Sequence, residues 1–127
     1  MVAESPTGVV EFFFDRFNDA DEFSLDEIFD KPWFLITGKT ARVFNSYSEA
    51  VDFQFLRNSG WGHSKINTMK SIYQDNETSL IVFNFSRLST EGREIYRADA
   101  THLLLYRAAG WTIKTVFING EMALSFD

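Results

Sequence analysis

The spacing of apolar residues changes once along this chain, and the change limits the folds open to it. In the first third, apolar residues recur at helical spacing, and Val9, Val10, Phe13, Phe14 and Phe17 form one stripe. Beyond about residue 62 the period becomes two, which is typical of β-strands. Helices followed by strands predict an α+β fold, in which a helical layer packs on one face of a sheet.

The strand-like part divides into four extended segments, at about residues 63–74, 79–89, 93–107 and 111–119. The stretches between them are short and contain turn residues such as Asn76, Gly92 and Gly110. Connections of this length join neighbouring antiparallel strands. We therefore expect these four segments to form an antiparallel meander.

The first part of the chain carries signals for helix starts and stops. Ser5–Pro6 precedes the apolar stripe and suits the start of a first helix. Ser24 with Glu27 and Ser46 with Glu49 have the spacing of capping boxes, which predicts two further helices. Pro32 should end the second helix, and residues 33–38 are rich in strand formers, so they predict a short extra strand.

Length and composition favour one domain, residues 1–127, of a soluble protein. The chain has no cysteine, which excludes disulfides, thiolate zinc sites and a cysteine nucleophile. The N-terminus has no positively charged region followed by an apolar core, and no apolar run is long enough to cross a membrane. We expect a cytoplasmic protein with no membrane partner.

Charge and aromatic content point to different partners. The net charge is -6, nine of the eighteen acidic residues fall within residues 1–30, and no basic stripe is present. A nucleic-acid partner is therefore not expected. Aromatic residues make up 17% of the chain, with fourteen phenylalanines, more than a small core needs. Some of these rings should line a cavity or an interface between subunits.

Three stretches carry a resemblance to a known family. They are "GVVEFFFDRFNDAD", the following "LDEIF", and "HLLLYRAAGWTIKTVFING" near the C-terminus. In this order the chain resembles the NTF2-like superfamily, the SnoaL-like and ketosteroid-isomerase-like α+β cone domains, over about residues 5–120. The resemblance implies a cystatin/NTF2-like cone: N-terminal helices on a strongly bent antiparallel sheet of four main strands plus short extra strands. The fold alone does not define a chemistry, because it hosts several enzyme classes and also proteins without catalysis.

The resemblance also implies an apolar pocket between helices and sheet, and a homodimer formed through the outer face of the sheet. A small apolar molecule is the expected ligand, with no metal and no cofactor. The expected pocket residues are Phe13, Phe17, Trp33, Phe53, Trp61, Tyr73 and Thr101.

The segment from residue 95 to 106 carries polar side chains inside an apolar strand. Alternation places Arg97, Asp99 and Thr101 on one face, which we expect to point toward the helices. The opposite face contains Tyr96, His102, Leu104 and Tyr106. We expect this second face to be the outer one and to contribute to the dimer interface.

Comparison with the enzyme branches of the superfamily leaves few catalytic candidates. A ketosteroid-isomerase site uses a carboxylate base and an oxyanion hole of Tyr and protonated Asp, whereas the matching positions here are Phe13, Thr37 and Thr101. Arg97 and Asp99 have the residue types of limonene-epoxide-hydrolase-like sites, but they lie one strand later in the chain than the corresponding residues of those sites. Dehydratase branches use a His–Asp pair, for which His63 with Asp30 is the candidate.

Two hypotheses remain from the sequence. The favoured one is a binding module whose aromatic pocket captures a small apolar molecule, with Arg97 and His63 offering a polar contact. The alternative is a cofactor-independent lyase, isomerase or hydrolase, in which Asp99 or His63 transfers protons and Arg97 stabilises negative charge. A domain whose role is its dimer surface is a third option.

Overall fold

The computed structural model describes residues 5–120, 122 and 124. Three helices and six strands follow one another along the chain. In order they are α1 (Pro6–Asn18), α2 (Glu22–Ile28), β1 (Phe29–Thr37), β2 (Thr40–Phe44), α3 (Phe53–Asn58), β3 (His63–Gln74), β4 (Thr78–Leu88), β5 (Glu94–Arg107) and β6 (Gly110–Ile118). None of the helices in the described part of the chain is long and apolar enough to cross a membrane.

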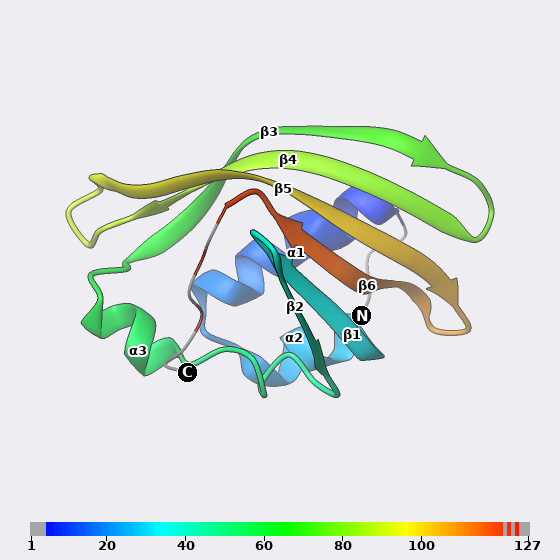
Figure 1. The fold of residues 1–127 in the computed structure, drawn as a ribbon, viewed down its shortest axis with the longest axis horizontal. Helices are drawn as coiled ribbons and strands as arrows, with labels where there is room; N and C mark the ends of the chain where they lie inside the picture. Colours follow the sequence, from blue (N-terminus) through cyan, green and yellow to red (C-terminus); the bar gives the residue numbers. More distant parts are fainter. Residues whose placement is uncertain (1–4, 121, 123, 125–127) are drawn as a thin grey trace.

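The strands form one strongly bent sheet in the order β2-β1-β6-β5-β4-β3. Figure 1 shows the long strands β3, β4 and β5 arching over α1, while α2 and α3 lie further below the sheet. The expected α+β cone, with helices on a bent sheet, is thus confirmed. The four long strands begin and end within one residue of the predicted segments.

Helix α1 is held in the concave face of the sheet by its apolar stripe. Val9, Val10, Phe13, Phe14 and Phe17 are all buried. The helix starts as predicted, because the side chain of its N-cap residue accepts a hydrogen bond from the third residue after it, with proline in the first turn. Phenylalanine at successive turns gives this helix a wide aromatic face.

The other two helices do not start where the capping boxes predicted. Helix α2 is capped by Asp21, whose carboxylate accepts hydrogen bonds from the backbone N–H and hydroxyl of Ser24. The Ser46–Glu49 pair closes a turn: the Ser46 hydroxyl accepts from the backbone N–H of Glu49. Helix α3 begins only at Phe53, after Asp52 as N-cap. A capping signal satisfied within a single turn does not require that a helix follow it.

The sheet is larger than predicted and contains one parallel pair. Strand β1 begins at Phe29, so Pro32 lies inside it, and Thr40–Phe44 forms an additional edge strand, β2. Strand β1 pairs in parallel with β6, while the other neighbours are antiparallel. The register of β1 shifts between Phe29 and Phe34, around the proline that cannot donate a ladder hydrogen bond.

The two faces of β5 are opposite to the prediction. Ala98, Ala100 and His102 point into the core and are buried. Arg97 and Asp99 are exposed on the outer face. The alternation itself is as expected, but both faces of this strand are largely apolar, and the face that carries the small alanines is the buried one.

A partly shielded ion pair connects the start of β1 to the hairpin between β5 and β6. The Asp30 carboxylate accepts two hydrogen bonds from Arg107, at 3.2 and 2.8 Å, and lies 3.2 Å from the Lys114 amine. These contacts, with the Arg107 hydrogen bonds as the largest cause, lower the pKa of Asp30. The side chain of Asp30 is only 14% exposed, so the pair is partly shielded from water.

Replacement of Asp30 by Asn should destabilise the fold by about 2 kcal/mol, because Arg107 and Lys114 would lose their shared carboxylate. Urea unfolding at neutral pH measures this change. Asp19→Asn is the matched control, since its 3.5 Å pair with Arg16 is exposed on both sides and should contribute about 0.5 kcal/mol or less. Equal effects of the two substitutions would contradict the assignment of Asp30 as an anchor.

Candidate functional site

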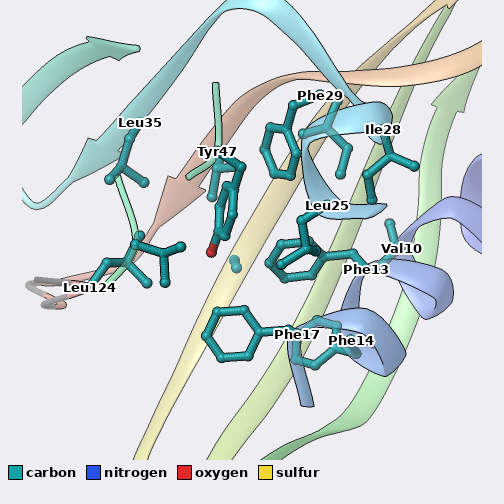
Figure 2. Packing of buried hydrophobic residues seen from close by; sticks show 14 of the residues in the cluster. Val10, Phe13, Phe14, Phe17, Leu25, Ile28, Phe29, Leu35, Tyr47 and Leu124 are labelled. Atoms are coloured by element: carbon teal, nitrogen blue, oxygen red, sulfur yellow. The ribbon is translucent and has the colours of Figure 1, made fainter. Parts of the chain in front are cut away.

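The described residues enclose a cavity between α1, the loop before α3 and the inner face of the sheet. Its volume is about 40 Å³. In Figure 2, the rings of Phe13 and Phe17 and the side chains of Tyr47 and Leu124 surround a common space, with the Tyr47 hydroxyl pointing toward it. The lining consists mostly of aromatic and aliphatic side chains: Phe13, Phe14, Phe17, Trp33, Leu35, Tyr47, Ser64, Phe83, Phe85, Arg87, His102, Val116, Ile118, Met122 and Leu124.

His102 is the polar group at the centre of this lining. It lies in the middle of β5, between Ile81 of β4 and Val116 of β6, and is 1% exposed. Its ring makes edge contacts with Phe13 and Phe83, with centroid distances of 5.4 and 4.9 Å. Nδ1 has no hydrogen-bond partner in the described part of the protein. Burial lowers the pKa of His102 from 6.5 to about 3, so the imidazole is neutral at physiological pH.

Trp33 provides a second unpartnered polar atom. Strand β1 places its indole in the wall, stacked on Phe44 and Tyr47 at 5.2 and 5.4 Å. The residue is completely buried, and its Nε1 has no hydrogen-bond partner among the described residues. Such orphaned donors are uncommon in protein interiors. Trp33 and His102, which both line the cavity, thus each carry a buried nitrogen without a hydrogen-bond partner in the part of the chain that the structure describes.

Tyr47 and Arg87 add further polar groups to the lining. Burial raises the pKa of the Tyr47 hydroxyl, while the positive charge of Arg87, which also lines the cavity, acts in the opposite direction. Arg87 is 8% exposed and its guanidinium lies 5.6 Å from the ring centroid of Tyr96. Tyr96 is its direct cross-strand neighbour on β5.

The end of α1 is clamped onto the sheet beside the cavity. The Asn18 side chain donates a hydrogen bond to the carbonyl of Ser64 and accepts one from its backbone N–H, at 2.8 and 2.7 Å. The Ser64 hydroxyl accepts from the indole N–H of Trp61. These contacts fix Phe14 and Phe17 of α1 against the inner face of the sheet.

Three of the seven predicted pocket residues, Phe13, Phe17 and Trp33, line the cavity. Phe53 and Trp61 are buried behind Phe17, with ring centroids 5.0 and 5.2 Å from it. They support the wall without being part of it.

The remaining two predicted pocket residues lie outside the cavity. Tyr73 is 50% exposed near the end of β3, where its hydroxyl donates to Asp75. Thr101 lines a separate, open hollow on the outer face of the sheet. The error for Thr101 comes from the reversed assignment of the faces of β5.

The predicted catalytic pair Arg97 and Asp99 also lies on the outer face. Instead of contacting Asp99, Arg97 lies 3.4 Å from the Glu94 carboxylate. Asp99 accepts a hydrogen bond from the side chain of Asn84 at 2.9 Å. Their catalytic roles stay predictions, but neither residue is among those that line the inner cavity.

His63 is exposed at the start of β3, on one edge of the sheet. Asp30 lies in β1, which is separated from β3 by β6, β5 and β4. The structure does not bring the candidate pair together, and Asp30 binds Arg107 and Lys114 instead.

Sequence reasoning missed His102, Arg87 and Tyr47 as cavity residues. A signal was present for His102: it shares its face with Ala98 and Ala100, and small residues mark the face where another element approaches closely. Arg87 shares the parity of Phe83 and Phe85 on β4, which predicts the inner face. Tyr47 follows no periodic pattern, because it lies in the irregular segment before α3.

The lining favours binding over proton transfer. No aspartate or glutamate is among the described residues around the cavity, and the neutral His102 is too weak a base to accept protons efficiently near neutral pH. The described residues also contain no cluster of three or more metal-ligating side chains. The groups available for a ligand are aromatic surface, an indole N–H, an imidazole, a phenol and a guanidinium.

The bent sheet around an aromatic helix agrees with a comparison against protein families. Residues 8–120 match the model of a family described as NTF2-like protein (DUF6841). The chain belongs to this NTF2-like family. No curated protein matches it.

Solved structures of other proteins share the fold of this NTF2-like protein at low identity. A member of the NTF2-like family from Streptomyces avermitilis, proposed to be a dehydratase, is 13% identical, covers 92% of this chain and 94% of its own, and has a TM-score of 0.66. A proposed calcium/calmodulin-dependent protein kinase type II association domain from Thiobacillus denitrificans is 12% identical, covers 96% and 99%, and has a TM-score of 0.67. A protein with a cystatin-like fold from Caulobacter vibrioides is 14% identical, covers 89% and 84%, and has a TM-score of 0.63. At these identities the similarity shows the fold alone.

The burial of neutral His102 should make stability depend on pH. Below pH 6.5 the unfolded chain binds a proton at His102 that the folded state binds only near pH 3, so the free energy of unfolding should fall as pH is lowered, by about 1.4 kcal/mol per pH unit from this residue. His102→Gln should lose this component, so the difference between wild type and variant should change by about 2 kcal/mol between pH 7 and pH 5.

Urea unfolding at several pH values measures this dependence. His63→Gln is the matched control, because it removes an exposed histidine and leaves His102 in place. The carboxylates are the same in all three proteins, so their contributions to the pH dependence of the free energy of unfolding cancel in the comparison. A constant difference between wild type and His102→Gln across this pH range would contradict a buried neutral imidazole.

Proposed function

We propose that this NTF2-like protein binds a small, largely apolar molecule in the cavity between α1 and the sheet. The observation that carries the proposal is that Nε1 of Trp33 and Nδ1 of His102, two buried polar atoms of residues that line one aromatic cavity, have no hydrogen-bond partner among the described residues. An unsatisfied buried polar atom costs about 1–3 kcal/mol, which a ligand with a matching polar group would recover. Apolar walls with a few convergent polar groups are typical of ligand sites.

The chemistry of the lining indicates what the bound molecule presents. The indole N–H of Trp33 can only donate, and neutral His102 offers one donor and one acceptor. A carbonyl oxygen directed at these groups would be matched to them. The aromatic edges of Phe13 and Phe83 that hold the imidazole suit a flat apolar body.

The cavity volume requires that part of the wall move when a ligand binds. An apolar cavity that holds benzene in another protein has ~150 Å³, and drug-sized ligands occupy about 300–1,000 Å³. The present 40 Å³ accommodates only a few water-sized molecules. Met122, which is part of the lining, has a long flexible side chain and could give way without displacement of the aromatic walls.

Acetophenone and ethylbenzene test the proposal, because they have nearly the same shape and only the ketone carries an acceptor. Wild type should bind acetophenone more tightly than ethylbenzene by roughly tenfold, as expected for a hydrogen bond made in a dry site. Trp33→Phe removes the N–H, keeps an aromatic ring, and should reduce this preference severalfold. Calorimetric or NMR titration measures the affinities.

Trp111→Phe is the matched control for this titration. Trp111 is also buried, but it packs on Tyr106 at the β5–β6 hairpin and is not among the cavity residues. This variant should bind both probes as wild type does. Absence of binding of either probe to wild type would overturn the proposal, as would an unchanged preference in Trp33→Phe.

Catalysis by Asp99 or His63 is the second candidate function. The structural similarity to a protein proposed to be a dehydratase supports it only at the level of the fold. Because neither residue faces the cavity, the arrangement of side chains supports binding better than proton transfer.

We also propose that a second copy of the chain covers the outer face of the sheet. The contact surface differs from the predicted one, because His102 and Leu104 are buried in the core. The outer face instead exposes Phe34, Val43 and Phe117, by 39%, 59% and 37%. Contiguous exposed apolar residues of this kind mark interaction surfaces.

The charges on the outer face suit a symmetric dimer in which two identical faces meet. A hollow of about 600 Å³ there is lined by Lys70, Asp99 and Phe117, among others. Two-fold pairing of identical faces can bring such opposite charges together across the interface. The fold similarity to a proposed kinase association domain is consistent with self-assembly.

Phe117→Glu should weaken this dimer by roughly 30-fold in its dissociation constant, as expected for loss of a residue at the centre of an interface. Analytical ultracentrifugation over a dilution series measures the constant. Phe23→Glu is the control, because Phe23 is 76% exposed on α2, away from the outer face. A monomeric wild type, or equal effects of both substitutions, would contradict the proposal.

A further inference from the structure

The hydroxyl of Tyr47 points toward the space inside the cavity (Figure 2). Tyr73 and Tyr106 are exposed by 50% and 56%, whereas Tyr47 is only 3% exposed. No described residue makes a hydrogen bond with the Tyr47 hydroxyl. Burial raises the pKa of this phenol, so it keeps its proton at physiological pH. The cavity therefore contains a neutral O–H group that a ligand can meet.

The ring that carries this hydroxyl packs against three other aromatic side chains. It stacks on Phe29, with ring centroids 4.5 Å apart, and on Trp33 at 5.4 Å. Phe13 meets it edge-on at 5.5 Å. A phenylalanine at residue 47 would make the same ring contacts without the cost of burying a hydroxyl group. Ring packing alone therefore does not account for a tyrosine at this position.

The irregular segment that carries Tyr47 is anchored on both sides of the peptide bond that follows this residue. The Asp26 carboxylate accepts hydrogen bonds from the backbone N–H and the hydroxyl of Ser48, at 2.8 and 2.9 Å. The Tyr47 carbonyl accepts from the backbone N–H groups of Ala50 and Val51, at 2.9 and 3.2 Å. Because backbone and ring are both fixed, the hydroxyl is already oriented before a ligand binds. Such preorganisation reduces the entropy lost on binding.

We propose that Tyr47 is a specificity-determining residue, whose hydroxyl donates a hydrogen bond to a carbonyl oxygen of a neutral ligand in the cavity. This inference rests on the proposed binding function and adds the side chain that selects the polar group of the ligand. It also names the ligand class as ketones and related carbonyl compounds, in preference to alcohols and hydrocarbons of the same shape.

The number of protons on each side of the contact favours a carbonyl over a hydroxyl. A phenol that faces an alcohol brings the contact two O–H protons but only one hydrogen bond, so one proton is left over. A phenol that faces a ketone brings one proton and uses it. The indole N–H of Trp33, also in the lining, can only donate, and no carboxylate among the described lining residues could accept a spare proton. An unsatisfied donor in an apolar cavity is costly, so the ketone should bind more tightly.

Acetophenone, 1-phenylethanol and ethylbenzene test the inference, because they share a ring and differ in the polar group. Wild type should bind acetophenone more tightly than 1-phenylethanol by roughly fivefold and than ethylbenzene by roughly tenfold. Tyr47→Phe keeps the ring, removes only the hydroxyl, and should reduce both ratios severalfold. Calorimetric titration measures the affinities, and circular dichroism in the near ultraviolet reports whether the variant keeps its packing.

Infrared spectroscopy provides a readout that a purely structural role of Tyr47 would not change. A hydrogen bond to a carbonyl oxygen lowers the stretching frequency of the C=O bond. The carbonyl band of isotope-labelled acetophenone should therefore lie at a lower frequency when it is bound to wild type than when it is bound to Tyr47→Phe. An identical frequency in both proteins would contradict a hydrogen bond from Tyr47.

Tyr106→Phe is the matched control. Tyr106 also carries a hydroxyl on a ring packed against a tryptophan, but it is exposed at the β5–β6 hairpin and is not among the cavity residues. This variant should keep the wild-type ratios and carbonyl frequency.

Two results would overturn the role of Tyr47 and leave the binding function intact. One is a preference of wild type for acetophenone that is unchanged in Tyr47→Phe. The other is binding of 1-phenylethanol by wild type as tight as that of acetophenone, which needs no substitution to be measured. Failure of wild type to bind acetophenone or ethylbenzene would instead overturn the binding function itself.

Discussion

The fold depends on the contact between the phenylalanine face of α1 and the inner face of the bent sheet. Phe13 packs edge-on against His102 of β5, and Phe14 packs against Phe83 and Phe85 of β4, with ring centroids 5.4 to 5.8 Å apart. Rings from α1 and β4 fill the concave side of the sheet, and the cavity lies within this aromatic packing.

The sequence predicted the order of elements and the four long strands well, because their signals are local. Alternation and short turns fix a hairpin within a few residues, as for the connection from β5 to β6. The start of α3 and the edge strand β2 were not predictable in this way. Asp52 caps α3, although the stronger capping pattern at Ser46 lies only a few residues earlier. The parallel pairing of β1 with β6 joins residues about 80 positions apart, which no local pattern specifies.

The site was predicted only in part, for a physical reason that lies in β5. Alternation sorts its side chains into two sets, but it does not say which set faces the helix when both are largely apolar. The charged residues Arg97 and Asp99 suggested a pocket because they looked out of place in an apolar strand. On an outer face they need no such explanation, since water and the neighbouring Asn84 and Glu94 satisfy them. The residue that does need an explanation is His102, whose buried Nδ1 has no hydrogen-bond partner among the described residues.

A buried imidazole whose Nδ1 has no hydrogen-bond partner among the described residues lowers stability, so its position is informative. A leucine or phenylalanine at residue 102 would fill the same space without the cost of burying an unsatisfied nitrogen. The same holds for the indole N–H of Trp33, which phenylalanine would avoid. Both residues line one cavity, and the proposed binding of a small molecule with a polar group would explain why two such costs fall in the same place.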